Sequence, residues 1–299
     1  MSKQNPPHLS SIWKASSNNL VFQTAYFVAN RYFGARHTLD CLETLQQQLP
    51  DIGLHRVSKQ FLEALGFALT PSSSVPSQIK QPDQPVLVVS TDHGAFIEPF
   101  IIAAAIDRPD IFFIGIKTYQ KLLGNNIAPH ILPVMPSRYA TNHRQGLKVK
   151  LSNTLNPTKP LYLAEQLTSE QITTLNQTSL THAANILTAG SVVAIFPNGG
   201  RKSSYPHWGS GLANIISTIP QTQHPNIQVA LISLQGPTKR AVALASRNIH
   251  RHRYQSELKP IPIICHTFTL SDLINNAQSD GYTDLTVTLQ FLLSQGKSA

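Results

Sequence analysis

Charged residues are scarce in this chain, and acidic residues are the scarcest. Asp, Glu, Lys and Arg make up 13% of the 299 residues, well below the usual ~25%. Because 24 basic residues stand against 15 acidic ones, the formal net charge is +9. Such a charge predicts attraction to phosphate groups, whether they belong to a small substrate, an anionic membrane, a nucleic acid or an acidic carrier protein.

Several other features are missing, and each absence excludes a class of protein. The two cysteines, Cys41 and Cys265, match no metal or redox spacing, which predicts free thiols in a reducing compartment. No apolar run approaches 18 residues, so we expect no transmembrane helix. The chain lacks His-Glu-x-x-His, a Cys/His cluster and Gly-x-Ser-x-Gly. These absences disfavour a metalloenzyme and a serine hydrolase, and we expect no bound metal.

The order of apolar patterns predicts an α/β domain behind a small helical region. Residues 1–80 show helical spacing at 12–33, 39–48 and 57–67, and a Pro- and Ser-rich linker covers 70–85. From residue 81 to 299 strand and helix patterns alternate, which favours a mixed, mostly parallel sheet flanked by helices. Strands are expected at 86–90, 111–116, 131–135, 161–163, 191–196, 229–234 and 262–268, and helices at 99–106, 118–123, 169–188 and 212–218.

The first candidate site follows the apolar run at 86–89. This run predicts a buried strand, and His93 comes shortly after it. Glu98 lies five positions later, directly before Pro99, a favourable first residue for a helix. Ligands of α/β sheets bind at the carboxyl ends of strands, where a carboxylate beside an imidazole would support it as a general base. The alternative is a surface histidine near a glutamate that caps a helix.

The second candidate site follows the strand expected at 191–196. Gly199 and Gly200 allow a ligand to approach the backbone closely, and adjacent amides in such a turn can hold an anion. Arg201 adds a planar guanidinium suited to phosphate, and Lys202 adds a second positive charge. The alternative is a solvated basic turn. On either interpretation the turn belongs to the same expected sheet as His93.

Together the two stretches resemble the glycerolipid acyltransferases, the glycerol-3-phosphate and lysophosphatidate acyltransferases. Residues 92–98, Asp-His-Gly-Ala-Phe-Ile-Glu, are similar to that family's Asn-His-x4-Asp block. Residues 196–203, Phe-Pro-Asn-Gly-Gly-Arg-Lys-Ser, are similar to its Phe-Pro-Glu-Gly-Thr-Arg-Ser block. The Gly-Gly-Arg turn is closest to the soluble plastid-type glycerol-3-phosphate acyltransferases. The chain diverges where Glu98 replaces Asp and Asn198 replaces Glu, and the middle block is matched only loosely, by Lys117 and by residues 136–138.

The resemblance implies transfer of a fatty acyl group from a thioester to a hydroxyl of glycerol-3-phosphate or a related phosphate-bearing acceptor. His93 would be the general base and Glu98 would orient it. The acceptor phosphate would be bound by Arg201, Lys202 and Arg138, with Gly199 and Gly200 at the turn. No cofactor is expected besides the co-substrate, acyl carrier protein or CoA carrying the acyl group.

Several alternatives stay open. The acceptor could be another lysophospholipid or a sugar lipid, or the fold could serve a non-catalytic membrane-binding protein. The basic stretch at 239–259 would dock an acidic carrier protein or an anionic membrane, or would be simply solvated. It holds one aromatic residue and no known motif, so no nucleic-acid partner is expected. The expected location is the cytoplasm with peripheral membrane contact, or the plastid stroma if the organism is a eukaryote.

Overall fold

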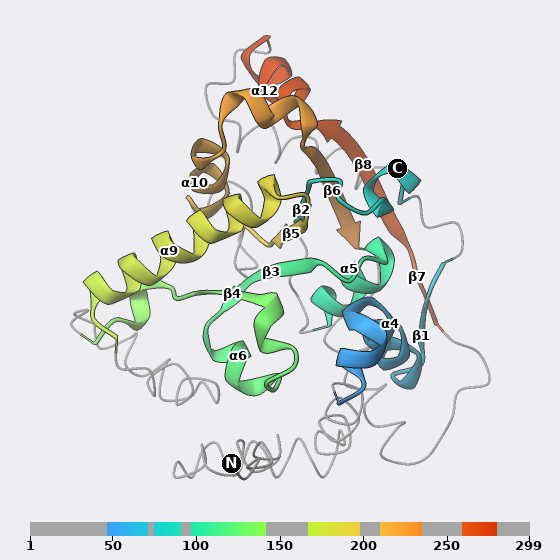
Figure 1. Cartoon of the computed structure of the whole chain (residues 1–299). Coiled ribbons are helices and arrows are strands. Elements are labelled where there is room, and N and C mark those ends of the chain that lie inside the picture. The colour runs from blue at the N-terminus through green and yellow to red at the C-terminus, as the bar shows by residue number, and fades with distance from the viewer. Residues whose placement is uncertain are drawn as a thin grey trace.

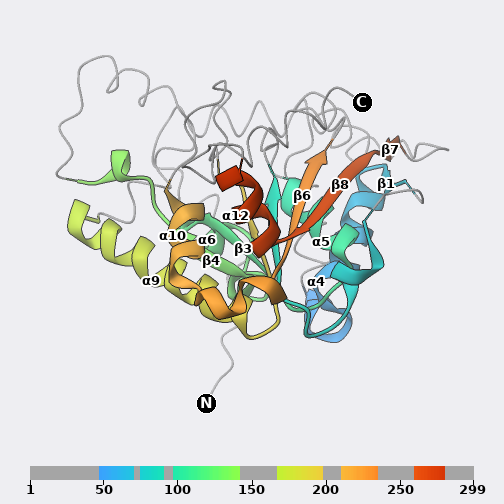
Figure 2. The ribbon, with the colours of Figure 1, turned by 90° about the horizontal axis from the view of Figure 1, so that it is seen from above.

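The computed structural model describes residues 47–70, 75–90, 97–141, 167–197, 210–234 and 259–279. These residues form three layers, with a central sheet between two groups of helices (Figures 1 and 2). The strands of the central sheet are β2 (Val86–Ser90), β3 (Ile111–Ile116), β4 (Ile131–Val134), β5 (Val192–Ile195), β6 (Gln228–Leu234) and β8 (Ile263–Thr269). A second, two-stranded sheet pairs β1 (Phe67–Leu69) with β7 (Lys259–Ile261).

The central sheet has the strand order β4-β3-β5-β2-β6-β8. Its first five strands run parallel, and β8 pairs antiparallel with β6. All five residues of β2 are buried, as expected for a central strand whose two faces are both covered. The fold class predicted from the sequence, a mostly parallel mixed sheet flanked by helices, is therefore confirmed.

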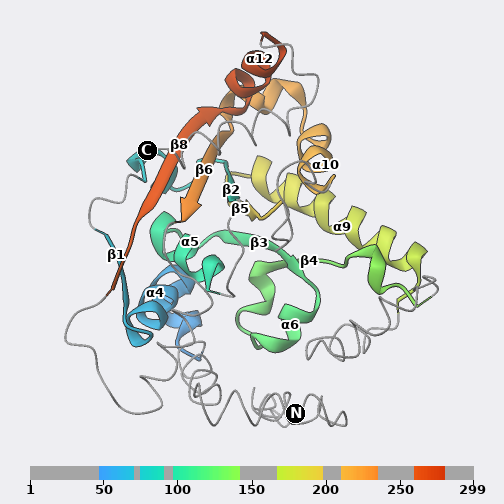
Figure 3. The ribbon, with the colours of Figure 1, turned by 180° about the vertical axis from the view of Figure 1, so that it is seen from behind.

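Successive residues of each strand point into two different cores. Helices α4 (Leu49–Ala64) and α5 (Glu98–Ile106) cover one face, where Val88 packs. Helices α9 (Ser169–Thr188), α10 (Gly211–Thr218) and α12 (Leu270–Ser279) cover the other, where Val89 packs. Figure 3 shows both helix layers from behind. The remaining helix is α6 (Thr118–Leu122), and 3-10 turns span Ser77–Lys80, Ala128–His130, Ser137–Tyr139 and Gln221–Asn226.

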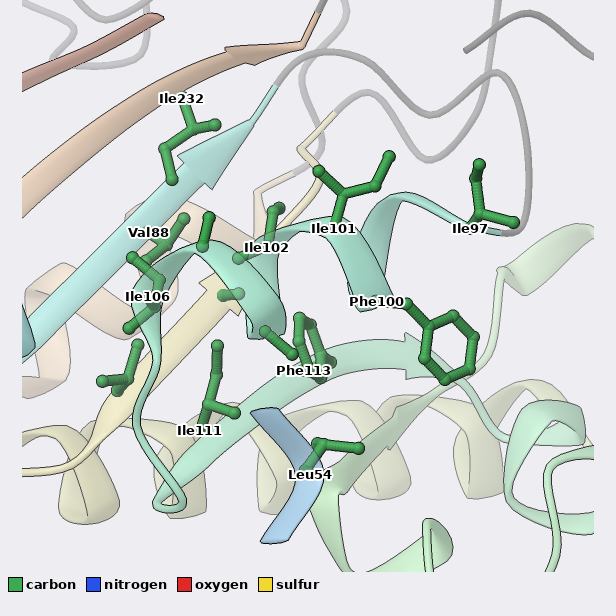
Figure 4. Packing of buried hydrophobic residues seen from close by; sticks show 14 of the residues in the cluster. Leu54, Val88, Ile97, Phe100, Ile101, Ile102, Ile106, Ile111, Phe113 and Ile232 are labelled. Carbon is green, nitrogen blue, oxygen red and sulfur yellow. The ribbon is translucent and has the colours of Figure 1, made fainter. Parts of the chain in front are cut away.

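Helix α5 forms the centre of the first core. It begins with Pro at its second position, ends at Asp107 in the left-handed conformation, and buries residues on every side. Figure 4 shows Ile106 of this helix beside Val88 of β2, and it shows Leu54 of α4 in the same cluster, near Phe113 of β3. An all-round apolar helix is stable only when it is buried, and seven of the nine residues of α5 are buried.

The expected elements at 86–90, 111–116 and 169–188 match β2, β3 and α9 in both type and bounds. The described residues before residue 65 differ from the helix expected at 57–67. Helix α4 starts earlier, at Leu49, and continues through a kink at Gly53, whose φ is +79°. Residues of α4 belong to the same hydrophobic cluster as the sheet. The expected strand at 161–163 lies outside the described residues. Within the described part of the chain, no helix combines the length and apolar character needed to cross a membrane.

Candidate functional site

The strands that precede the two sequence blocks are neighbours in the sheet. β2 and β5 run parallel, with Val89 opposite Ile195. Their carboxyl ends therefore lie level with each other, at Ser90 and at Phe196. One block begins two residues after Ser90 and the other includes Phe196. Although the two blocks are about a hundred residues apart in sequence, both leave the same edge of the sheet from adjacent positions.

The predicted site residues are only partly described by the structure. His93, Gly199, Gly200, Arg201 and Lys202 lie outside the described residues. The backbone of Arg138 belongs to the 3-10 turn Ser137–Tyr139, which follows β4. Glu98 is fully described, and it is the first residue of α5.

Glu98 is a buried acid at the carboxyl edge of the sheet. Its side chain is 2% exposed. As the first residue of α5 it sits at a helix N-terminus, where the helix dipole favours a negative charge. The neighbouring Ile97, Ile101 and Ile102 have no exposed surface, so the apolar core holds the backbone that carries this carboxylate. The structure thus provides a fixed, buried acid at the place where the sequence predicts one.

A cavity of about 460 Å³ opens at the carboxyl ends of β3, β4 and β5. Its lining includes Ile116 at the end of β3, Met135 after β4, and Phe196 after β5. Pro99 and Phe100, the two residues after Glu98, also line it. The walls are mostly apolar, and the volume lies within the range of ~300–1,000 Å³ typical of pockets for small molecules. A lipophilic ligand in this cavity would lie beside the first turn of α5.

Helix α6 contributes a tyrosine to the same cavity. Tyr119 of α6 lines the cavity. Burial, and to a smaller extent the negative charge of Glu98, raise the pKa of Tyr119 above the ordinary tyrosine value. Its phenol therefore keeps its proton near neutral pH and can donate a hydrogen bond.

Side chains of α9 hold the far wall of the cavity in place. The Asn176 amide accepts a hydrogen bond from the Met135 backbone amide at 2.8 Å, and donates one to the Met135 carbonyl at 3.0 Å. The Ser179 hydroxyl donates to the carbonyl of Pro133 at 2.5 Å. These bonds join α9 to β4, an edge strand of the sheet, and so fix the width of the cavity on this side.

The sequence did not reveal this cavity, because its lining comes from short stretches of many separate elements. Phe100, in the helix expected at 99–106, packs in the core and also lines the cavity. Tyr119 lay within an expected helix and carried no motif. Among the residues that the structure describes, no group of three or more His, Cys, Asp or Glu side chains gathers where it could hold a metal ion.

Comparisons with models of protein families, with curated proteins and with solved structures found no match.

Proposed function

We propose that this protein is an O-acyltransferase with a fold like that of the glycerol-phosphate acyltransferases. It would transfer a fatty acyl group from acyl carrier protein or CoA to a hydroxyl of glycerol-3-phosphate or a related phosphate-bearing acceptor, as a step of phospholipid synthesis. The observation that carries the proposal is the apolar cavity beside Glu98, at the edge where the strands of both motif blocks end.

The cavity supports a long acyl chain as the ligand. Its volume of about 460 Å³ lies within the range of ~300–1,000 Å³ of pockets for small molecules, and its walls are mostly apolar. Apolar walls favour such a chain through the burial of its surface, worth about 0.8 kcal/mol for each methylene group.

The proposed chemistry uses His93 as the general base. Its Nε2 removes the proton from the acceptor hydroxyl while that oxygen attacks the thioester carbonyl carbon. The tetrahedral intermediate then collapses, the carbon–sulfur bond breaks, and the proton passes from the imidazolium to the leaving thiolate. Glu98 orients the ring and stabilises the imidazolium, as the acid of a catalytic triad does, but without a covalent enzyme nucleophile.

The acceptor phosphate would be held by positive charges that follow the strands. Arg201 and Lys202 follow β5 in the sequence and Arg138 follows β4, and both strands end at the carboxyl side of the sheet. A guanidinium binds phosphate through two parallel hydrogen bonds, and Gly199 and Gly200 would let backbone amides reach the same anion. The net charge of +9 would assist the approach of an anionic substrate, carrier protein or membrane.

The test is release of free thiol from acyl-CoA and from acyl carrier protein, measured with and without glycerol-3-phosphate or lysophosphatidate. We expect His93→Ala to lower kcat by about 10²–10⁴-fold, the usual contribution of a general base. Glu98→Gln should lower it as well, because the imidazolium loses its charged partner. The matched controls are His182→Ala on α9 and Glu63→Gln on α4, both of which change exposed residues.

Each outcome separates the proposal from an alternative. Full activity of His93→Ala would show that the general-base assignment is wrong. Turnover with another lysophospholipid or with a sugar lipid, but not with these two acceptors, would point to a different acceptor. If no thioester is consumed with any acceptor while the protein binds anionic vesicles, the non-catalytic membrane-binding alternative is favoured.

A further inference from the structure

The α4 side of the cavity is apolar except for two hydroxyl groups. We use this name for the part lined by residues of the first core cluster, by those packed against it, and by Ser58 of α4. Its apolar members are Leu54, Phe100, Phe113, Leu123, Ile127, Ile131 and Phe196. The two remaining residues are Ser58 of α4 and Tyr119 of α6. A plain hydrocarbon chain would use neither hydroxyl.

Of the two hydroxyl groups, that of Ser58 gives the stronger evidence for a polar ligand group. It is 0% exposed, and its buried Oγ has no hydrogen-bond partner among the described residues. Burying a hydroxyl without a partner is unfavourable, so an unpaired one in a native fold calls for an explanation. Alanine would fill the same position between α4 and α5 without that cost. A ligand oxygen on this side of the cavity would supply the partner that Ser58 lacks, once the packed side chains that cover its Oγ move aside.

Tyr119 is suited to the same ligand oxygen. Its phenol lines the same side of the cavity, and burial raises its pKa, so that it stays protonated. A serine and a tyrosine hydroxyl can each donate and accept a hydrogen bond. A ligand hydroxyl can do both as well, and so it can bond to the two side chains at once.

The position of Ser58 indicates where on the chain this hydroxyl lies. Phe61, one helical turn after Ser58, packs its ring against that of Phe100, with centroids 4.9 Å apart and the two planes tilted by 54°. Phe100 is two residues after Glu98, the acid proposed to orient the general base. Ser58 is therefore close to the first turn of α5 and to the reacting end of the chain.

We propose that the α4 side of the cavity selects acyl chains with a hydroxyl group near the thioester, such as 3-hydroxyacyl chains, and that Ser58 and Tyr119 bind this hydroxyl. The proposal rests on the proposed acyltransferase function, which it deepens by naming the acyl donor. It assigns to both residues a role in specificity.

The first experiment measures binding, which requires no catalysis. The full chain is loaded with cis-parinaric acid, and its fluorescence is followed as tetradecanoic or 3-hydroxytetradecanoic acid displaces it. We expect the hydroxylated acid to bind about fivefold more tightly, the ordinary net worth of one hydrogen bond. In Ser58→Ala and in Tyr119→Phe this ratio should fall toward one. Ser233→Ala is the matched control, because Ser233 is a buried serine of β6 that is not among the lining residues.

The second experiment measures the same ratio as kcat/KM with the two acyl thioesters. A preference in binding without turnover of either thioester would support the proposal on specificity and contradict the acyltransferase function. Turnover of both thioesters with equal kcat/KM would support the acyltransferase function and contradict the proposal on specificity. Equal affinity of the wild-type chain for the two acids, no displacement by either, or a preference unchanged in both variants would each overturn the proposal on Ser58 and Tyr119.

Discussion

Replacing Arg108 with alanine should destabilise the protein strongly, because this buried arginine joins three segments at the amino edge of the sheet. Its side chain is 2% exposed. The guanidinium donates to the Gln84 carbonyl at 2.6 Å and to the Gly190 carbonyl at 2.7 Å. It also forms a two-bonded ion pair with Asp110, in which Nε lies 2.9 Å from Oδ1. Gln84 precedes β2 and Gly190 precedes β5, so Arg108 aligns the two strands that lead to the candidate site.

The magnitude follows from what Arg108→Ala leaves behind. The substitution leaves the Gly190 carbonyl unpaired in a buried position, which costs about 1–3 kcal/mol. It also leaves the Asp110 carboxylate without its partner, and removing one side of a buried ion pair costs about 3–5 kcal/mol. Because the Asp110 side chain is 34% exposed, water can replace part of the lost interaction. We therefore expect a loss of about 3–4 kcal/mol, a large share of the usual 5–15 kcal/mol of folding free energy.

Urea denaturation followed by circular dichroism measures this loss. Arg56→Ala is the matched control, because Arg56 lies on α4 with an exposed side chain, and such changes cost less than about 0.5 kcal/mol. A loss below about 1 kcal/mol for Arg108→Ala would refute the reasoning, since even one buried unpaired carbonyl should cost that much. An equal loss in Arg56→Ala would show that removal of any arginine destabilises the chain.

Three further predictions concern single positions. Gly190→Ala should lower the free energy of unfolding by about 1–3 kcal/mol or more, as measured by urea denaturation. The φ of Gly190 is +101°, and a Cβ there would lie 2.8 Å from the Asp83 carbonyl oxygen. Unchanged stability of the variant would contradict this prediction. Burial raises the pKa of Cys265 to about 12 from 9.0. In a Cys41→Ser background its thiol should therefore react slowly with an aromatic disulfide reagent at pH 8 until urea is added, and rapid labelling of the native protein would refute this assignment. The free energy of unfolding should also fall as pH rises from about 9 to 12, because over this range only the unfolded thiol loses its proton. Leu123→Trp should place a bulky indole ring in the cavity and shift the preferred acyl thioester to shorter chains in the thiol-release assay. An unchanged chain-length profile would exclude this wall from the acyl site.

The sequence was sufficient to predict the elements whose apolar patterns are long or continuous. The runs 86–90 and 111–116 became β2 and β3 because β-branched and aromatic residues fill both faces of a central strand. The pair β1 and β7 was not predicted, because three residues form no recognisable period. Helix α12 was also missed, since Asn, Gln and Ser dominate its second half and favour a loop by composition.

The candidate site could be predicted from the sequence only in part, for a different reason. Each motif block could be recognised locally, but the adjacency of β2 and β5 depends on the strand order, which local patterns do not encode. The cavity depends on still more distant relations, because its walls require the bonds from Asn176 and Ser179 to β4 and the packing of α4 against α5. Ser58 has no motif, and only its burial in the folded chain marks it.

The glutamate at position 98 gains significance from the way α5 is held. Seven of the nine residues of this helix are buried, so the helix cannot slide toward a ligand without losing contacts in a closely packed core. The reach of the acid is therefore set by its side chain alone. The resembling family has aspartate in the corresponding position, and the extra methylene of Glu98 extends the carboxylate further from a fixed backbone.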